Sequence, residues 1–307
     1  MLDAVDRSRL KGLMLTARHL IDGLHAGRHV SARHGRDLEF FDYRPYCPGD
    51  AATRIDWKLF GRTNRYHLRR QRQLANLEVY LMVDATASMQ FAGLDRQGQP
   101  VLDRLATTKL TYAKTLAATI AFLTFKQKDR VGLGLFSNQM DHHTPPGGTW
   151  AHLQKICWTL EQTQASQGPG NTNACLQHAH ALLRRRGVFV LIADLLDDPV
   201  PLLESLGRLR HDRFDVIVFQ VLTAQELDLT PLGNLPMKMV DAETRQTIAT
   251  NPSQIASHHK ELMSKHVAVL RGGCDRFGID YNLVTTNHSV VDALRRYLTH
   301  RSRHRRS

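Results

Sequence analysis

The feature that most constrains the fold of this chain is a mainly apolar run that ends on an acidic residue. Residues 77–84 close on Asp84 in this way, and residues 188–194 close on Asp194. A strand of a parallel sheet has this composition because helices cover both of its faces, and its carboxyl end can deliver a polar residue to the sheet edge. The sequence therefore predicts a buried parallel sheet with polar groups gathered along one edge.

The same apolar texture recurs between segments with helical spacing. Further strands are predicted over 129–136, 214–221 and 280–284, and a hairpin over 237–240 and 246–249. Helices are predicted over 104–125, 150–160, 174–183, 199–209, 252–271 and 290–297. Strands that alternate with helices of this length require crossover connections. The expected fold class is therefore α/β, with a doubly wound, mostly parallel, Rossmann-like sheet.

The beginning and end of the chain have a different character. Apolar residues recur at helical spacing over 10–24, and aromatic residues interleave with charges over 38–50. These segments predict a helix followed by short strands joined by turns. We expect three regions: a small N-terminal α/β-strand module at 1–75, the sheet domain at 76–299 and a basic tail at 300–307.

Cysteine usage and hydropathy bear on the cellular location. The four cysteines lie far apart with no Cys-x-x-Cys pair, which favours isolated buried thiols over a zinc or redox motif. These residues are Cys47, Cys157, Cys175 and Cys274. The start lacks the order of a secretory signal, and no stretch approaches the ~20 apolar residues that cross a bilayer. The expected location is the cytoplasm, without a transmembrane segment.

The charge of the chain is strongly positive. It amounts to +12, from 41 Lys and Arg against 29 Asp and Glu, and residues 295–307 carry several arginines and no acid. Such a surface attracts acidic partners. A basic scaffold on nucleic acid or an anionic membrane is therefore one alternative, and a merely solvated basic face is another. Nucleic acid is disfavoured because the usual recognition motifs are absent, and at most a weak association with a membrane surface is expected.

Polar residues on three loops provide the candidate functional site. Asp84, Thr86 and Ser88 follow the first buried strand, Thr172 lies in a loop before a helix, and Asp194 ends another strand. Loops at the carboxyl ends of parallel strands converge, so these oxygens are expected to meet. Carboxylates and neutral oxygens suit Mg²⁺, which is usually held by one or two carboxylates with water. A carboxylate from outside can then complete the coordination.

The pattern Asp84-x-Thr86-x-Ser88, with Thr172 and Asp194 further on, resembles the metal-ion-dependent adhesion site of von Willebrand factor A domains. Thr86 stands where that site has a serine, which retains the hydroxyl and adds a methyl group. The resemblance implies a von Willebrand factor A-like fold for residues 76–299. It also implies a bound Mg²⁺, or Mn²⁺ or Ca²⁺, and a protein partner that offers an acidic side chain.

A second resemblance covers most of the chain. Tyr-Arg-Pro-Tyr-Cys-Pro-Gly-Asp at 43–50, Arg-Ile-Asp-Trp-Lys at 54–58 and Val-Gly-Leu-Gly-Leu-Phe at 131–136 are similar to the bacterial domain-of-unknown-function family fifty-eight. That similarity implies association with MoxR-type AAA+ ATPases in complex assembly or maturation. It points to a protein-binding adaptor, with no small-molecule substrate.

Structural roles for the same residues are the main alternative. Asp84 and Ser88 could cap the following segment, and Thr172 and Asp194 could cap helices. A second cluster, formed by Asp50, Arg54, Asp56 and Trp57, is expected to lock the N-terminal module to the sheet domain, with Trp57 in the core; the alternative is a docking surface.

An enzyme is the other alternative, in particular a metal-dependent phosphohydrolase, because a hard ion beside carboxylates can activate water. The three loops offer no evident general base or nucleophile. The sequence also lacks a phosphate-binding Gly-x-x-x-x-Gly-Lys loop and a Gly-x-Ser-x-Gly elbow. The seventeen histidines are expected to be scattered over the surface. The interpretation is therefore a binding protein without catalytic activity.

Overall fold

The fold of the chain is taken from a computed structural model. It describes residue 17 and residues 40–47, 50, 53, 55–71, 77–93, 108–166, 168, 170–232, 234, 236–240 and 246–304. The chain divides into two compact units, a larger one of residues 1–28 and 77–307 and a smaller one of residues 29–76.

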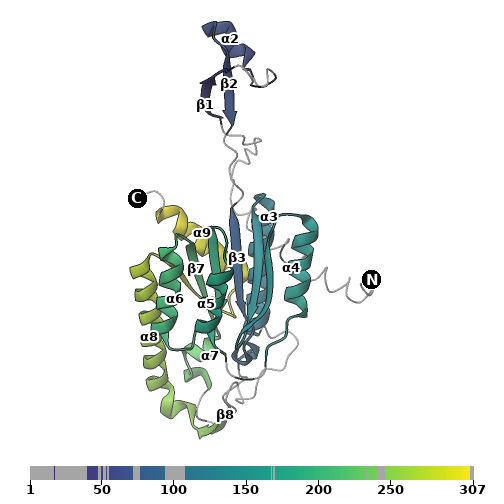
Figure 1. Cartoon of the computed structure of the whole chain (residues 1–307). Helices are drawn as coiled ribbons and strands as arrows, with labels where there is room; N and C mark the ends of the chain where they lie inside the picture. The colour runs from purple at the N-terminus through teal and green to yellow at the C-terminus, as the bar shows by residue number, and fades with distance from the viewer. Residues whose placement is uncertain are drawn as a thin grey trace, which may run out of the picture. The chain divides into compact units, whose positions relative to one another are not determined.

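The larger unit is built on a six-stranded sheet (Figure 1). Its strand order is β10-β7-β6-β3-β4-β5, and every neighbouring pair is parallel except β4 with β5. The strands are β3 (Glu78–Asp84), β4 (Arg130–Phe136), β5 (Met140–Gly147), β6 (Val188–Ala193), β7 (Asp215–Leu222) and β10 (Asp280–Thr285). The predicted α/β class with a mostly parallel sheet is confirmed.

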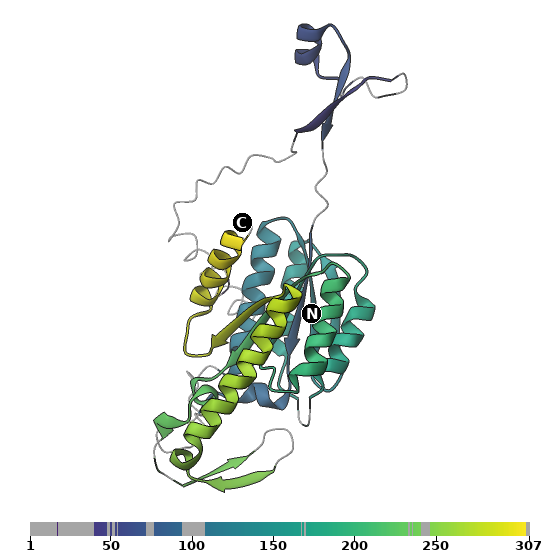
Figure 2. The same cartoon turned by 90° about the vertical axis from the view of Figure 1, so that its left-hand side faces the viewer.

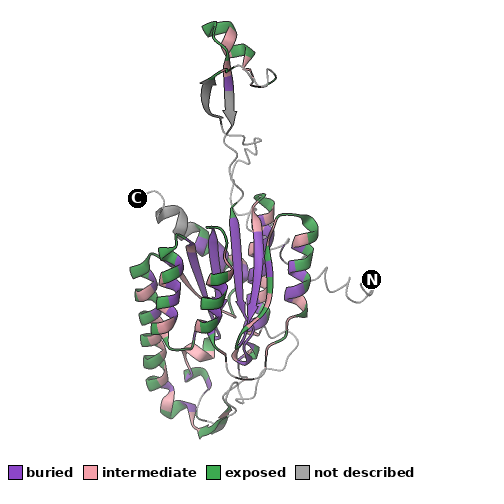
Figure 3. Cartoon of the chain, viewed as in Figure 1, coloured by how far each residue is buried: buried purple, intermediate pink, exposed green. Residues whose placement is uncertain are grey.

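Helices cover both faces of this sheet (Figure 2). Buried residues of α3 (Lys109–Lys126), α4 (Trp150–Gln162) and α9 (Val290–His304) pack on one face. Buried residues of α5 (Thr172–Leu182), α6 (Pro199–His211) and α8 (Pro252–Phe277) pack on the other. Successive side chains of β3 alternate between the two cores, and all seven residues of the strand are buried (Figure 3). This explains its nearly continuous apolar sequence.

One strand of the sheet was not predicted. β5 carries two histidines and two consecutive prolines, and it pairs antiparallel to β4 at the edge of the sheet. Proline has no N–H to donate to a ladder, so it is tolerated in a strand mainly at an edge. The prolines and histidines that make this segment resemble a loop in the sequence are thus tolerated because the strand lies at an edge.

Short elements follow β3 and β7. They are η2 (Ala87–Gln90), α7 (Ala224–Leu227), η3 (Thr230–Leu232) and the predicted hairpin, observed as β8 (Met237–Val240) and β9 (Thr247–Thr250). Of the predicted helix over 10–24, only Ala17 is described, and it is buried in the core shared with α3. No described helix is both long and apolar enough to traverse a lipid bilayer.

The end of α9 differs from the prediction. The helix continues to His304, seven residues beyond the predicted end, so the predicted basic tail at 300–307 starts as helix. The sequence of α9 contains no proline or glycine that would stop it.

The smaller unit contains β1 (Phe40–Pro45), α2 (Trp57–Thr63) and β2 (His67–Gln71), with β1 and β2 antiparallel. Asp56 caps α2 by accepting hydrogen bonds from the backbone N–H groups of Lys58 and Leu59. Trp57 is 61% exposed, so its predicted place in a core is wrong. Its ring instead packs edge-on against Phe60 and Tyr66 at the surface of this small unit.

Candidate metal centre

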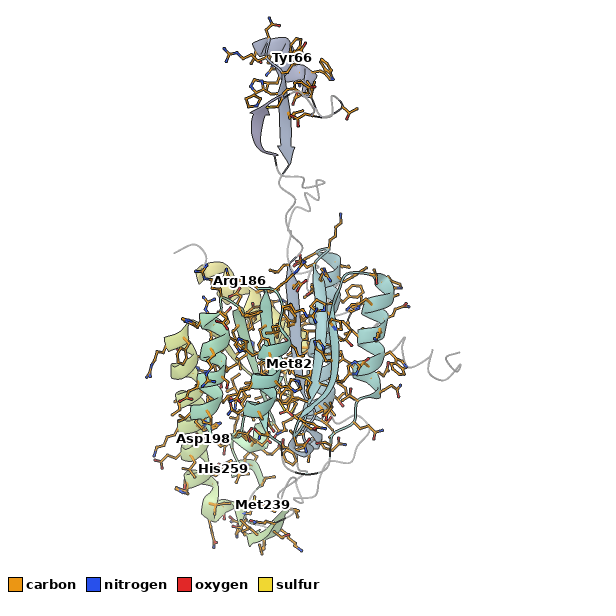
Figure 4. All side chains as sticks on the ribbon, viewed as in Figure 1. Tyr66, Met82, Arg186, Asp198, Met239 and His259 are labelled. Carbon is orange, nitrogen blue, oxygen red and sulfur yellow. The ribbon has the colours of Figure 1, made fainter. Side chains whose placement is uncertain are left out.

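The candidate site lies at the carboxyl end of the central strands. Val83 of β3 is opposite Ile192 of β6, so Asp84, one residue beyond Val83, and Asp194, two residues beyond Ile192, lie at the same end of two neighbouring strands. Arg186, just before β6, and Asp198, shortly after it, are labelled at opposite ends of the larger unit in Figure 4. The end marked by Asp198 is therefore the edge where the polar loops lie.

The first loop folds back on itself through its own polar groups. The backbone N–H of Thr86 donates to Asp84 Oδ1 at 2.8 Å, and Thr86 Oγ1 lies 3.0 Å from Ser88 Oγ. Asp84 and Thr86 are buried, and Ser88 is half-buried. Thr86 makes no side-chain cap to η2. The loop thus presents a carboxylate and two adjacent hydroxyls within five residues.

The second loop reaches the same edge through backbone hydrogen bonds. Ala85 N–H donates to Phe136 O at 2.8 Å, and Asn171 N–H donates to Ser137 O at 3.1 Å. The end of β4 therefore joins the first loop to the start of α5, where Thr172 is the first residue and is buried.

Helix capping does not explain the predicted site residues. The cap of α5 is Asn171, whose Oδ1 accepts from Ala174 N–H, and the cap of α6 is Asp198. Neither Thr172 nor Asp194 has that role. The capping alternative is thus wrong for these two residues.

Asp194 is held by a residue that sequence reasoning missed. Lys109, the first residue of α3, is fully buried, and its Nζ donates to Asp194 Oδ2 at 2.8 Å and to Glu226 Oε1 at 2.6 Å. The backbone carbonyl of Asp194 accepts from Gln220 Nε2. Asp194 is therefore fixed both by its backbone and by a buried ion pair.

At this edge the carboxylates of Asp194 and Glu226 lie beside the ammonium group of Lys109. Burial raises the pKa of Asp84 well above its usual value, and the nearby Asp194 raises this pKa further. Burial alone would lower the pKa of Lys109, but the carboxylates of Asp194 and Glu226 outweigh it and raise this pKa. Lys109 is thus charged, and Asp84 lacks a comparable direct partner among the ion pairs of the described residues.

The donor set of the first loop fits a hard divalent cation. Adjacent oxygens on octahedral Mg²⁺, each about 2.1 Å from the ion, are about 3.0 Å apart. The hydroxyls of Thr86 and Ser88 have this separation already. Asp84 would supply negative charge that its burial otherwise disfavours. Clusters of three or more His, Cys, Asp or Glu side chains with metal-site spacing are absent from the described part of the chain.

Lys109 and Glu226 left little signal in the sequence. They are separated from each other by 117 residues, and Lys109 is separated from Asp194 by 85. The available signal was a lysine in the first turn of a helix with no acidic residue, where the helix dipole disfavours a cation. A lysine in this position is stabilised only if acidic side chains lie close to its ammonium group.

Comparison with known proteins gives the class and then the family. A doubly wound α/β unit with polar loops at its carboxyl edge is a ligand-binding architecture. The family model described as "Protein of unknown function DUF58" matches residues 42–268. The chain belongs to this family.

Individual relatives and solved structures are also similar to this chain. The chain is 28% identical over 250 residues to "Uncharacterized protein Rv1480" of Mycobacterium tuberculosis (strain ATCC 25618 / H37Rv), covering 80% of this chain and 74% of the relative. "Uncharacterized protein Mb1516" of Mycobacterium bovis matches to the same extent. A structure of BatB from Bacteroides thetaiotaomicron is 13% identical with a TM-score of 0.47, covering 74% of this chain and all of BatB. The SpRpn10 VWA domain is 8% identical with a TM-score of 0.39, covering 72% of this chain and 94% of that domain.

Proposed function

We propose that this protein is a metal-dependent protein-binding adaptor, whose carboxyl-edge centre binds an acidic side chain of a partner. The observation that supports this most is the preset pair of hydroxyls on Thr86 and Ser88, beside the buried carboxylate of Asp84.

Each residue has a defined part in this proposal. Asp84, Thr86 and Ser88 hold the cation, Thr172 joins them from the start of α5, and Asp194 lies beside them at the end of β6. A bound Mg²⁺ would supply positive charge and an open coordination position. Because the hydroxyls of Thr86, Ser88 and Thr172 are neutral, that charge is only partly cancelled, and a carboxylate from outside is attracted.

Room for the partner exists next to the first loop. A pocket of about 630 Å³ is lined by Ala87, Gln90, Thr108, Glu161 and Ser166, among others. Ser166 is tied to the loop by a hydrogen bond from its N–H to Ala85 O at 2.7 Å. The lining of the pocket is mainly polar. It therefore suits a partner segment in which polar residues flank the acidic side chain that reaches the metal.

Titration with Mg²⁺ and Mn²⁺ by calorimetry tests the metal dependence. The natural protein should bind the ion, and Asp84→Ala should abolish the heat. Asp275→Ala is the matched control, because it removes an exposed carboxylate from α8, outside the candidate centre. If the D84A and D275A titrations are indistinguishable, the metal has no part in this site.

A MoxR-type AAA+ ATPase is the proposed partner, on the basis of the family resemblance in the sequence. Its binding to the immobilised chain is best measured at constant Mg²⁺, because the ATPase itself requires the ion. Binding should be retained by D275A and lost by D84A. Equal binding by the two variants would place the ATPase contact elsewhere.

A further inference from the structure

A buried lysine next to the candidate metal centre requires its own explanation. The side chain of Lys109 is 0% exposed, and its Nζ contacts two carboxylates at 2.8 and 2.6 Å. It stands in the first turn of α3, at the positive end of the helix dipole, where a cation is disfavoured. Only its acidic partners make this position tolerable for a charged group.

We propose that Lys109 is a built-in cation that keeps Asp194 out of the ligand set, so that the centre binds a divalent ion weakly until a partner's carboxylate completes it. This inference rests on the proposed function, since it assigns the division of labour within the same site. Asp84, Thr86, Ser88 and Thr172 remain as protein ligands.

The geometry holds Lys109 firmly at Asp194. Its second partner, Glu226, cannot readily move, because Glu226 Oε2 accepts from the N–H of Thr223 at 2.7 Å and from Thr223 Oγ1 at 3.0 Å. This capping box fixes α7 at the end of β7. Lys109 therefore bridges Asp194, just after β6, and α7, just after β7, and recruiting Asp194 to a metal would break a buried charge-assisted hydrogen bond.

Electrostatic repulsion acts in the same direction. Lys109 is hydrogen-bonded to Asp194, which follows β6, and β6 pairs with β3 up to the residue before Asp84, so the ammonium charge lies at the edge where Asp84 is placed. The same positive charge opposes a divalent cation at Asp84, and the opposition is strong because the surroundings exclude water.

The consequence is a coupling between the metal and the partner. A centre with one available protein carboxylate leaves much of the ion's charge uncompensated, so a carboxylate from outside adds more to the binding than it would if Asp194 were also a ligand. Binding of either one then increases the affinity for the other by the same factor.

Calorimetric titration of the full chain with Mg²⁺ alone tests this inference. Lys109→Met should bind Mg²⁺ at least about ten-fold more tightly than the natural protein, because it removes a positive charge close to the ion in surroundings that exclude water. Lys126→Met is the control: it removes the same charge from the other end of α3, about 25 Å along the helix axis, and should leave the affinity unchanged.

Asp194→Asn provides a second variant that retains Lys109 and its bond to Glu226. In the natural background it should change the Mg²⁺ affinity less than about three-fold, whereas in the Lys109→Met background it should cancel the gain. An affinity that is unchanged or weaker in Lys109→Met, or a loss above about ten-fold in Asp194→Asn alone, overturns the inference.

The outcomes separate this inference from the proposed function. If the natural protein binds Mg²⁺ and Lys109→Met gains nothing, the inference fails and the metal-dependent adaptor stands. If only Lys109→Met binds measurably, the inference holds, and the natural centre without its partner binds the ion too weakly to detect. If neither binds, both fail.

Discussion

At the scale of the residue, the burial of the Asp84 carboxylate costs free energy of folding. The side chain is almost completely buried beside the Asp194 carboxylate, and burial raises its pKa well above the usual value. A group held in an environment that disfavours its charged form is typical of a functional site. The free energy lost by this burial should be recovered when the charge is removed.

Asp84→Asn should therefore stabilise the metal-free protein. The amide keeps the Oδ1 acceptor for the N–H of Thr86 and removes the charge, so the free energy of unfolding at pH 7 should rise by about 1 kcal/mol. Urea denaturation in the presence of a chelator measures this change. A lower stability of D84N than of the natural protein would mean that the charge of Asp84 is already compensated within the chain.

Buried thiols define a second property of individual residues. Burial raises the pKa values of Cys157, Cys175 and Cys274 to about 12, whereas Cys47 is exposed. The expectation of four buried thiols is thus wrong for Cys47, which lies in the turn that Asp50 closes. A thiol reagent at pH 8 should modify Cys47 rapidly in the folded protein and the other three only on unfolding. Rapid reaction of all four would contradict this burial.

The same thiols make stability depend on alkaline pH. Their folded pKa values lie above the value of about 8.5 for an unfolded thiol, so their contribution to stability is complete below that pH. It is lost as the pH rises toward about 12. Urea denaturation from pH 7 to 11 should show the decrease, and replacement of Cys157 by Ser should make the pH dependence shallower.

At the scale of the element, close approach between strands restricts β6. A Cβ added to Gly187 would lie 2.0 Å from the backbone carbonyl oxygen of Glu78, which cannot move without disturbing β3. Gly187→Ala should therefore destabilise the protein by about 2 kcal/mol or more, as overpacking does.

Gly272 is the matched control for this prediction. It lies within α8, and an added Cβ would meet nothing within 4 Å. Gly272→Ala should raise stability by about 0.5–1 kcal/mol, because alanine is the better helix former. Thermal denaturation of the two variants gives the comparison, and equal effects of the same sign would refute the packing described for β6.

The elements also show where sequence reasoning succeeded. β3, β6 and β7 were predictable because a parallel strand covered on both faces must be apolar throughout. β5 was not, because its prolines and histidines resemble a loop. Trp57 was wrongly placed in a core because aromatic residues are usually buried, whereas the small unit around α2 leaves it exposed.

At the scale of the whole molecule, the strand order decides what the sequence could reveal about the site. Asp84, Thr86, Ser88 and Asp194 could be assigned to one edge because each lies at or just after the end of a recognisable strand. The Lys109 bridge could not, because it joins the start of α3 to Asp194 and to Glu226 of α7, which are 85 and 117 residues away in the sequence. Only the three-dimensional arrangement shows that the ammonium group of Lys109 lies at this edge.

The most direct test of the metal centre is a crystal structure of the protein grown with Mn²⁺, with an anomalous difference map. A peak should lie among the side-chain oxygens of Asp84, Thr86 and Ser88, with Lys109 still bonded to Asp194. A map without a peak at this edge, at Mn²⁺ concentrations that saturate calorimetric binding, would contradict a metal-dependent adaptor.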